Sequence, residues 1–237
     1  MIYGIGIAYR HLDVMAYSIA RYFQTGWTPE AMVQWFIVNG HWPMSPDPGR
    51  DAVLAARFLD AKVLMAPENL GGHGNFSWAL KQFEFKDDDY ILNMDLNANP
   101  QNKGWLRAAL DVMAADPRCS MVGLLHNRIV NERKWDHEVV AGHRIVSSQN
   151  WASFKTSLFR GSVMREGLGS TRSKYYGFVE EWMFNRTKAM GMRQLYLLDF
   201  REDFTLIPDP KVYNEYKAAH AFHGYDKTFE QYLKELK

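Results

Sequence analysis

The sequence predicts an α/β fold whose mostly parallel central sheet carries helices on both faces, and three observations lead to this prediction. Short apolar runs of strand length recur through the first half of the chain. Stretches with helical periodicity separate these runs, and parallel strands need such crossover helices between them. Apolar residues make up 47% of the 237 residues, which is enough for the buried core of a layered domain.

The first expected strands are short apolar runs bounded by turn-forming residues. They are Ile2–Ala8, Met32–Val38, Lys62–Met65, Tyr90–Met94 and Ser120–Leu125. A helix is expected where apolar residues recur every three or four positions, as at Leu12, Met15 and Ile19. The helices expected between the strands are His11–Gln24, Asp51–Leu59, Asn75–Phe85 and Lys103–Ala115.

The elements after Leu125 are expected to alternate less regularly. They are a hairpin over Glu138–Ser148, a strand over Ser153–Arg160, a polar loop over Arg165–Tyr176, a helix over Phe178–Met190, a strand over Arg193–Leu198 and a helix over Val212–Phe222. Because no repeat, low-complexity tract or linker interrupts the chain, a single domain over residues 1–237 is predicted.

Composition and charge exclude several classes of protein. The formal net charge of +1 excludes a chain that is basic throughout, so any nucleic-acid contact would need a local patch. The single Cys119 cannot form an internal disulfide, and its apolar neighbours indicate a buried thiol. No apolar run has the roughly 18 residues of a membrane-spanning helix, and the first residues are typical of a strand rather than a signal peptide. A cytoplasmic location is the expectation.

The segment Asp95-Leu96-Asn97-Ala98-Asn99-Pro100 directly follows the expected strand Tyr90–Met94. Open α/β sheets bind ligands at the carboxyl ends of their strands, so this segment is a candidate binding site. Its carboxylate and amide oxygens are the ligands that Mg²⁺ or Mn²⁺ accept, often together with substrate phosphates. The same residue types also favour tight turns, so the segment alone leaves both interpretations open.

Two further segments have residues typical of binding or catalysis. The glycine-rich stretch from Asn69 to Asn75 precedes an expected helix, where backbone N–H groups are able to approach a phosphate. A plain flexible connection is the alternative. Glu180 and Glu181 begin a later helix, where one of them is placed to act as a general base. Stabilisation of the helix dipole by the two carboxylates is the alternative there.

Taken together, these segments resemble the GT-A class of nucleotide-sugar glycosyltransferases, and especially its large inverting group. The resemblance spans Ile2 to Asp199. The matching segments are Ala8-Tyr9-Arg10 after the first strand, Asn69-Leu70-Gly71 before a helix, Asp95-Leu96-Asn97 with Pro100 at the metal motif, and Glu180-Glu181 followed by Arg186 and Gly191.

The resemblance implies an enzyme that transfers a sugar from a nucleotide-sugar donor, expected to be UDP-linked, to an acceptor hydroxyl with inversion. Residues 1–100 would form the half that binds the nucleotide sugar, and residues 101–237 the half that binds the acceptor and holds the base. The residues implied for nucleotide binding are Ala8, Tyr9, Arg10, Asn39, Asn69, Gly71, Asn75 and Asp95.

The resemblance also implies a divalent metal, Mn²⁺ or Mg²⁺, with Asp95 and Asn97 as its ligands. Metal dependence is expected to be conditional, because the neutral Asn97 replaces the second carboxylate of the motif. The carboxylates that could supplement the site are Asp199, Glu202 and Asp203. The base would be Glu180 or Glu181, and the spacing to Arg186 and Gly191 favours Glu180.

The acceptor is expected to be anionic, because basic residues outnumber acidic ones between Asn127 and Tyr175. The basic residues of this stretch are Arg128, Arg133, Lys134, Arg144, Lys155, Arg160, Arg165, Arg172 and Lys174, with Trp135, Trp151 and Tyr175 among them. Nucleic acid, including a modified DNA base, and a phosphorylated glycan are such acceptors. An ordinary charged surface is the alternative. Rival functions are a non-catalytic nucleotide-sugar-binding protein, which Asn97 favours, and a nucleotidyltransferase.

Overall fold

The computed structural model describes residues 1–26, 33–126, 137–148, 155–165, 179–204, 210–220 and 229–236. Within these ranges the strands are β1 (Ile2–Ala8), β2 (Val33–Asn39), β3 (Lys62–Met65), β4 (Tyr90–Met94), β5 (Ala98–Pro100), β6 (Cys119–His126), β7 (His137–Val140), β8 (His143–Ser147), β9 (Ser157–Arg160) and β10 (Arg193–Phe204). The helices are α1 (Leu12–Gly26), α2 (Pro48–Arg57), α3 (Gly71–Leu80), α4 (Trp105–Ala115), α5 (Gly161–Arg165), α6 (Val179–Ala189), α7 (Lys211–His220) and α8 (Phe229–Glu235).

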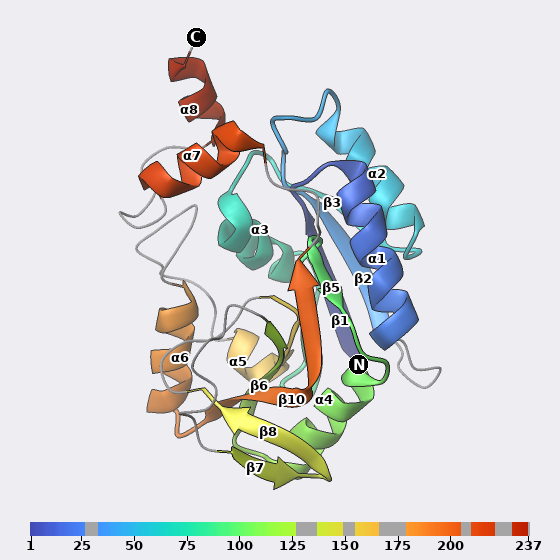
Figure 1. Ribbon diagram of the computed structural model, residues 1–237, viewed down its shortest axis with the longest axis vertical. Helices are drawn as coiled ribbons and strands as arrows, with labels where there is room; N and C mark the ends of the chain where they lie inside the picture. The colour runs from blue at the N-terminus through green and yellow to red at the C-terminus, as the bar shows by residue number, and fades with distance from the viewer. Residues whose placement is uncertain are drawn as a thin grey trace.

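One sheet with the order β3-β2-β1-β4-β9-β6-β10-β8-β7 runs through the described part of the chain, and β5 pairs with β10 beside it (Figure 1). Strands β3, β2, β1 and β4 are parallel to one another, and β6 is parallel to β10. Strand β9 lies antiparallel between β4 and β6, so both groups run in the same direction. This confirms the mostly parallel sheet and brings the carboxyl ends of β1, β2, β4, β6 and β10 to one edge.

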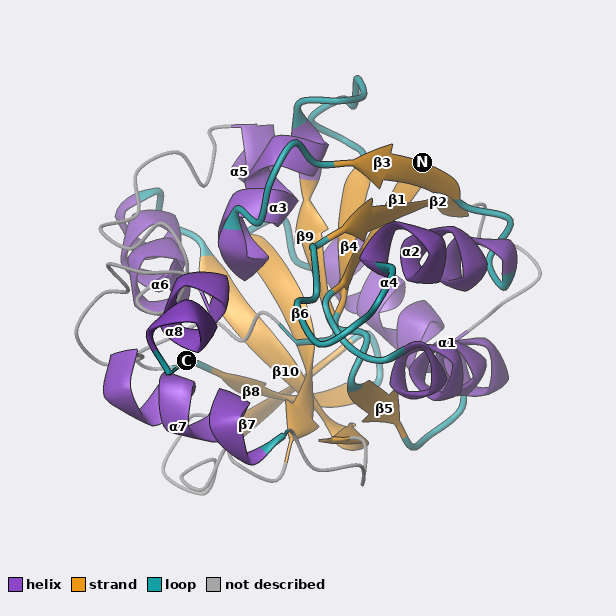
Figure 2. Cartoon of the chain, turned by 90° about the horizontal axis from the view of Figure 1, so that it is seen from above, coloured by secondary structure: helices purple, strands orange, loops and turns teal. Residues whose placement is uncertain are grey.

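Helices cover both faces of the sheet, as predicted (Figure 2). On one face, α1, α2 and α4 pack in a large apolar core, and α3, α5 and α6 contribute to a second core on the other face. Successive strand residues point to opposite faces, so Ile91 joins one core and Leu92 the other. Burying each such side chain contributes roughly 1.5–3 kcal/mol, and two apolar faces explain why the strands are continuous apolar runs.

Helix α3 begins at Gly71 rather than at the expected Asn75, so the glycine-rich loop is the first turn of the helix. The side-chain oxygen of Asn69 accepts a hydrogen bond from the Gly71 N–H at 2.9 Å, which starts the turn. Gly71 has a φ of 73°, a left-handed conformation that glycine adopts without strain. The prediction of a separate loop was therefore wrong, because this turn chemistry begins the helix early.

Strand β5 and helices α5 and α8 were not predicted from the sequence, and the last strand is longer than predicted. Strand β10 continues past Leu198 to Phe204, with a register shift between Leu197 and Arg201. Such an irregularity interrupts the regular alternation, which explains why the apolar pattern alone ended the strand at Leu198. The hairpin of β7 and β8 and the buried thiol of Cys119 were predicted correctly.

The two last helices, α7 and α8, pack together on the loop that follows β2 (Figure 1). Their contact is an aromatic cluster that consists of Trp42, Tyr213, Tyr216 and Phe229, all of them buried. The Trp42 and Tyr213 rings meet edge to face, with their centroids 5.0 Å apart. The cluster therefore ties the C-terminal helices to the end of the sheet where β2 finishes.

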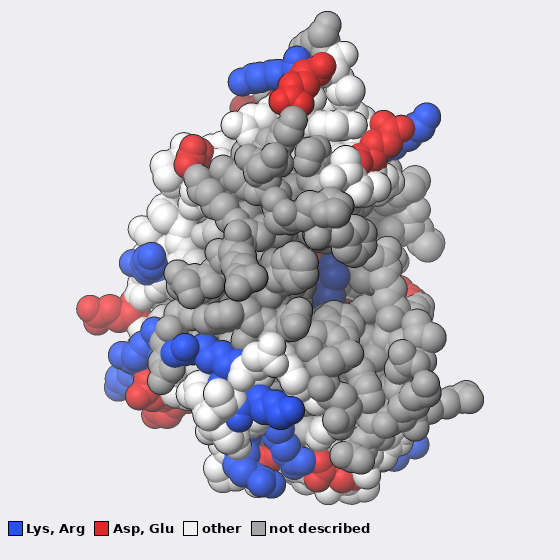
Figure 3. Space-filling view, turned by 90° about the vertical axis from the view of Figure 1, so that its left-hand side faces the viewer, with Lys and Arg blue, Asp and Glu red and all other residues white. Residues whose placement is uncertain are grey.

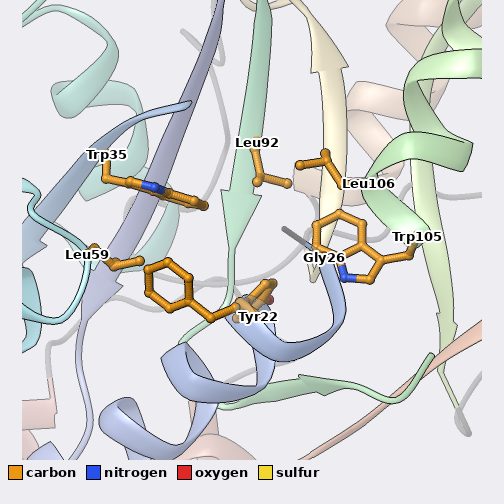
Figure 4. Close-up of a pocket in the computed structure, with 8 residues that line it drawn as sticks. Tyr22, Gly26, Trp35, Leu59, Leu92, Trp105 and Leu106 are labelled. Atoms are coloured by element: carbon orange, nitrogen blue, oxygen red, sulfur yellow. The ribbon is translucent and has the colours of Figure 1, made fainter. Parts of the chain in front are cut away.

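A small apolar cavity of about 10 Å³ lies between α1, α4 and the sheet (Figure 4). Its lining includes Tyr22, Trp35, Leu92 and Trp105. The volume corresponds to about one water molecule, and the apolar lining offers that water few partners. It is a gap in core packing and not a binding site.

Candidate functional site

The parallel strands β1, β2 and β4 end side by side and bring together residues that the sequence analysis assigned to one site. Residue Ala8 ends β1, Asn39 ends β2 and Asp95 follows β4. The Ala8 carbonyl accepts a hydrogen bond from the Gly40 N–H at 3.0 Å. The Asn39 side chain accepts one from the His41 N–H at 2.9 Å, so it shapes this turn.

The start of α3 joins the same edge through Asn69 and Tyr9. The Asn69 Nδ2 donates to the Tyr9 hydroxyl at 3.3 Å, and burial raises the pKa of Tyr9 so that the hydroxyl stays protonated. Asn75 is fully buried in the second turn of α3, and its side-chain amide has no hydrogen-bond partner among the described residues. Buried amides without partners are uncommon, so Asn75 remains a candidate for contact with a ligand or water.

Arg10 lies between this edge and the aromatic cluster. Its guanidinium donates to the Tyr9 carbonyl at 2.6 Å. It also lies 5.7 Å from the ring centroid of Trp42 and 5.3 Å from that of Tyr213. Cation–π contacts of this kind contribute roughly 0.5–2 kcal/mol, so α7 helps to position Arg10.

Asp95 forms an ion pair with Lys155, whose Nζ lies 2.5 Å from the Asp95 Oδ2. The Asn97 N–H donates to the other carboxylate oxygen at 3.2 Å. Burial opposes the charge of Asp95, but Lys155, Arg10 and these hydrogen bonds outweigh it and lower its pKa. The Asp95 side chain is 25% exposed, so this ionised residue is also partly accessible.

Glu202 on β10 interacts electrostatically with Asp95 and is only 1% exposed. Its Oε2 accepts a hydrogen bond from the Thr156 N–H at 3.2 Å, whereas its Oε1 has no partner within the described chain. Burial raises the pKa of Glu202 to about 8, and the nearby charge of Asp95 adds to this effect. Glu202 is therefore mostly protonated at neutral pH.

The segment that begins at Asp95 forms a turn, because the Ala98 N–H donates to the Asp95 carbonyl at 2.9 Å. This confirms the turn, and the role of the segment in ligand binding stays a prediction. Among the carboxylates considered as supplementary ligands, Asp199 pairs with Arg144 at the exposed surface. Glu202 instead interacts electrostatically with Asp95. Asp203 is paired in the sheet register with Asn99.

The described residues do not fit a preformed divalent-metal site. They contain no group of three or more His, Cys, Asp or Glu side chains that could hold a metal ion. Asn97 is a neutral ligand, and Lys155 already places an ammonium on the Asp95 carboxylate. A divalent ion at Asp95 would have to displace that ammonium or accept its repulsion.

Glu180 and Glu181 lie in the first turn of α6, as expected. Their side chains are outside the described residues, so their relation to Asp95 stays a prediction. The same holds for the basic and aromatic residues of the ranges 127–136, 149–154 and 166–178.

The described members of the basic stretch each have a partner. Arg144 pairs with Asp199 and Arg165 with Asp87. Arg160 donates to backbone carbonyls. On the face shown in Figure 3, coloured basic side chains gather at the lower end with acidic side chains among them. The described residues therefore give no support to a basic acceptor surface.

No known protein family and no curated protein matches the sequence, but solved structures match the fold. The mannosyltransferase PcManGT from Pyrobaculum calidifontis, in complex with GDP-Man and Mn²⁺, has a TM-score of 0.65 at 12% identity, over 92% of this chain and 60% of that chain. GalNAc-T7 with UDP, GalNAc and Mn²⁺ has a TM-score of 0.67 at 7% identity, over 86% of this chain and 44% of that chain. TarS of S. aureus has a TM-score of 0.56 at 15% identity, over 88% of this chain and 37% of that chain.

These likenesses show that the chain has the GT-A fold of nucleotide-sugar glycosyltransferases, as the sequence motifs predicted. The chain spans between 37% and 60% of the length of the three proteins. Among the described helices, none is long and apolar enough to cross a membrane.

The ion pair between Asp95 and Lys155 was not predicted from the sequence. Lys155 was considered only as one member of a basic stretch, and Glu202 only as a supplementary metal ligand. The two residues are 60 and 107 positions from Asp95, and no local spacing links them. Their proximity depends on the insertion of β9 and on the length of β10, neither of which the sequence pattern fully predicts.

Proposed function

We propose that the chain is an enzyme that transfers a sugar from a nucleotide-sugar donor to an acceptor hydroxyl. The observation that carries this proposal is an ionised, accessible Asp95 at the carboxyl edge of a GT-A sheet. Tyr9, Arg10 and Asn69 lie at the same edge through their mutual contacts. A carboxylate suits the hydroxyls of ribose and sugar, whereas a guanidinium suits the diphosphate.

The expected donor is UDP-linked, and GDP-linked sugars are the first alternative. One structural neighbour is in complex with GDP-Man and another with UDP. In this proposal Asp95 accepts hydrogen bonds from donor hydroxyls, and Arg10 lies on the diphosphate side. Gly71 and Asn75, at the start of α3, complete the nucleotide site.

The proposed reaction is a single displacement with inversion. The acceptor oxygen attacks the anomeric carbon while the bond to the nucleoside diphosphate breaks on the opposite side, and the acceptor proton passes to a glutamate. Successive helix residues point about 100° apart, so only one of Glu180 and Glu181 is able to face the acceptor. The spacing to Arg186 and Gly191 favours Glu180.

A divalent ion stays conditional in this proposal. Asp95 and Asn97 would be its ligands, and when bound it would neutralise the leaving diphosphate. Because the described residues do not fit a fixed metal site, no step of the reaction depends on it here. An anionic acceptor likewise stays an expectation from the sequence. A non-catalytic nucleotide-sugar-binding protein is the second candidate, and the neutral Asn97 favours it.

The proposal is tested by measuring thermal stabilisation of the folded chain by UDP- and GDP-sugars, with release of the nucleoside diphosphate as the readout of turnover. Binding to the native state raises the melting temperature. Asp95→Ala should abolish both stabilisation and turnover. Glu180→Gln should keep stabilisation but reduce turnover by at least about a hundredfold, and Glu181→Gln should reduce it less.

Asp199→Ala is the matched control, because it removes an exposed carboxylate whose partner is Arg144. It should leave both readouts unchanged. Near wild-type stabilisation and turnover in Asp95→Ala would remove the central claim. Stabilisation of the wild type without any turnover would favour the binding protein.

A further inference from the structure

The ion pair between Lys155 and Asp95 has no role in the proposed function. The ammonium and the carboxylate lie 2.5 Å apart at the carboxyl edge of the sheet, and their side chains are 30% and 25% exposed. The pair is thus neither a buried structural bridge nor a loose surface contact. It lies at the edge of the sheet where the proposed function puts the donor, and Arg10 acts on the same carboxylate.

We propose that Lys155 supplies the positive charge that binds the diphosphate of the donor, so that nucleotide binding by this chain needs no divalent cation. The inference rests on the proposed function and names the group that would hold the diphosphate at the site. The chemical class of ligand is a nucleoside diphosphate, free or linked to a sugar.

The carboxylate of Asp95 has both oxygens engaged by donors. Lys155 contacts Oδ2, and the Asn97 N–H contacts Oδ1. A metal ion binding there would compete with both contacts and would lie beside an ammonium of like charge. The ammonium, in contrast, has three N–H donors, so one lysine is able to bridge a carboxylate and a phosphate oxygen.

Hydrogen bonds to neighbouring elements fix the backbone at Lys155 and Thr156. Its own carbonyl accepts a hydrogen bond from the Asn93 Nδ2 at 2.8 Å, across from β4. The next residue, Thr156, donates its N–H to Glu202, and its hydroxyl lies 2.6 Å from that of Tyr22. The backbone on this side of Lys155 is therefore fixed to α1, β4 and β10, as a preformed binding residue requires.

The net charge of the site favours an anion. Lys155 and Arg10 are both cationic, and both act electrostatically on the single carboxylate of Asp95. Among the described residues, two cations thus act on this carboxylate, and a diphosphate is the part of a nucleotide sugar that such cations attract.

Calorimetric titration with UDP and with GDP, in EDTA and again in Mn²⁺, tests the proposal. The wild type should bind one of them in EDTA, with an affinity that Mn²⁺ changes less than about threefold. Lys155→Met, which keeps the apolar stem, should weaken binding in EDTA by about 10–100-fold, as expected for the loss of a charge-assisted contact. Added Mn²⁺ should restore part of that loss, because the Asp95 carboxylate is then open to the ion.

Two further variants keep the result interpretable. Lys155→Arg retains the charge and should retain more of the affinity in EDTA than Lys155→Met. Lys62→Met is the matched control, because Lys62 is an exposed lysine at the first residue of β3, at the opposite edge of the sheet. It should bind as the wild type does, and circular dichroism should show all variants folded.

The outcomes separate this inference from the proposed function. Wild-type binding that appears only with Mn²⁺ would overturn the role of Lys155 while the transferase proposal stands. Unchanged binding by Lys155→Met in EDTA would overturn it as well. Absence of UDP and GDP binding in both conditions, in a folded wild type, would overturn the proposed donor class and this inference with it. Electron paramagnetic resonance of Mn²⁺ adds a direct readout, since the wild type without nucleotide should leave the ion in solution.

Discussion

A cation lies near each end of strand β9, and the two cations have different surroundings. Arg160 is its last residue, at the amino edge of the sheet, and donates to the carbonyls of Cys119 at 2.6 Å, Met113 at 2.5 Å and Asp116 at 2.9 Å. Lys155 lies just before the strand, at the carboxyl edge, and pairs with one carboxylate that is partly exposed.

The polar groups around the two cations also differ in how completely they are paired. At the amino edge, Arg193 pairs with both Asp116 and Glu138, so the charges there compensate one another. At the carboxyl edge, Glu202 keeps an oxygen without a partner among the described residues. We infer that Arg160, whose guanidinium donates to three backbone carbonyls, stabilises the fold. Lys155 lies at an edge where a buried carboxylate oxygen has no partner among the described residues, and such a place is suited to a ligand.

The largest expected effect concerns Arg160. In Arg160→Met, three backbone carbonyls lose a donor, and the free energy of unfolding should fall by about 2–4 kcal/mol. Lys155→Met should lower it by less than about 1 kcal/mol, because that pair is partly exposed. Urea unfolding followed by circular dichroism measures both. Equal stabilities of the two variants would contradict the different roles assigned to Arg160 and Lys155. Nucleotide binding by folded Arg160→Met should be unchanged.

A second effect, which depends on pH, is expected for Glu202. The pKa of a glutamate in an unfolded chain is about 4.3, and that of folded Glu202 is about 8. Between these values the unfolded chain releases a proton that the folded chain keeps, so this group destabilises the fold increasingly as pH rises. Glu202→Gln removes the titration.

Its stability relative to the wild type should therefore increase from pH 5 to pH 8, by at most about 1.4 kcal/mol per pH unit. Urea unfolding of both proteins at several pH values measures this difference, in which the titration of all other groups cancels. A difference that stays constant with pH would show that Glu202 is ionised in the folded protein.

The smallest effect is expected for Arg144, which forms an exposed ion pair with Asp199 on β10. Solvent screens such pairs and side-chain entropy opposes them. Arg144→Met should unfold at the same urea concentration as the wild type, within the error of the measurement. A clear loss of stability would mean that basic residues of the second half stabilise the fold wherever they lie, and the contrast between Arg160 and Lys155 would lose its meaning.

The sequence predicts the first half of the sheet well, because its strands are continuous apolar runs. The positions of β1, β2, β3 and β4 follow from this pattern, and the place of Asp95 at the carboxyl edge follows from them. Parallel strands of one sheet end at one edge, so local information is enough there. The motifs that resemble GT-A transferases add the class of fold, and the structure confirms it.

The rest of the site depends on contacts between distant segments. Asp95 meets Lys155 only because the short β9 is inserted between β4 and β6, and a four-residue strand has little pattern of its own. Glu202 reaches the site because β10 continues beyond its register shift. The start of α3 was misplaced because Gly71 and Asn69 form a turn that also begins a helix. The choice between Glu180 and Glu181 still rests on spacing.

The insertion of β9 has a consequence for synthesis of the chain on the ribosome. Strand β6 is made before β9, yet β9 lies between it and β4 in the finished sheet. At roughly 5–20 residues per second, about 2–7 s pass between the completion of β6 and that of β9. Throughout that interval the edge of β4 presents unpaired N–H and C=O groups, a template for pairing with β6 in the wrong place or with another nascent chain. Slower elongation over residues 127–160 would lengthen the exposure, so the yield of native protein should depend on the rate of translation through this segment.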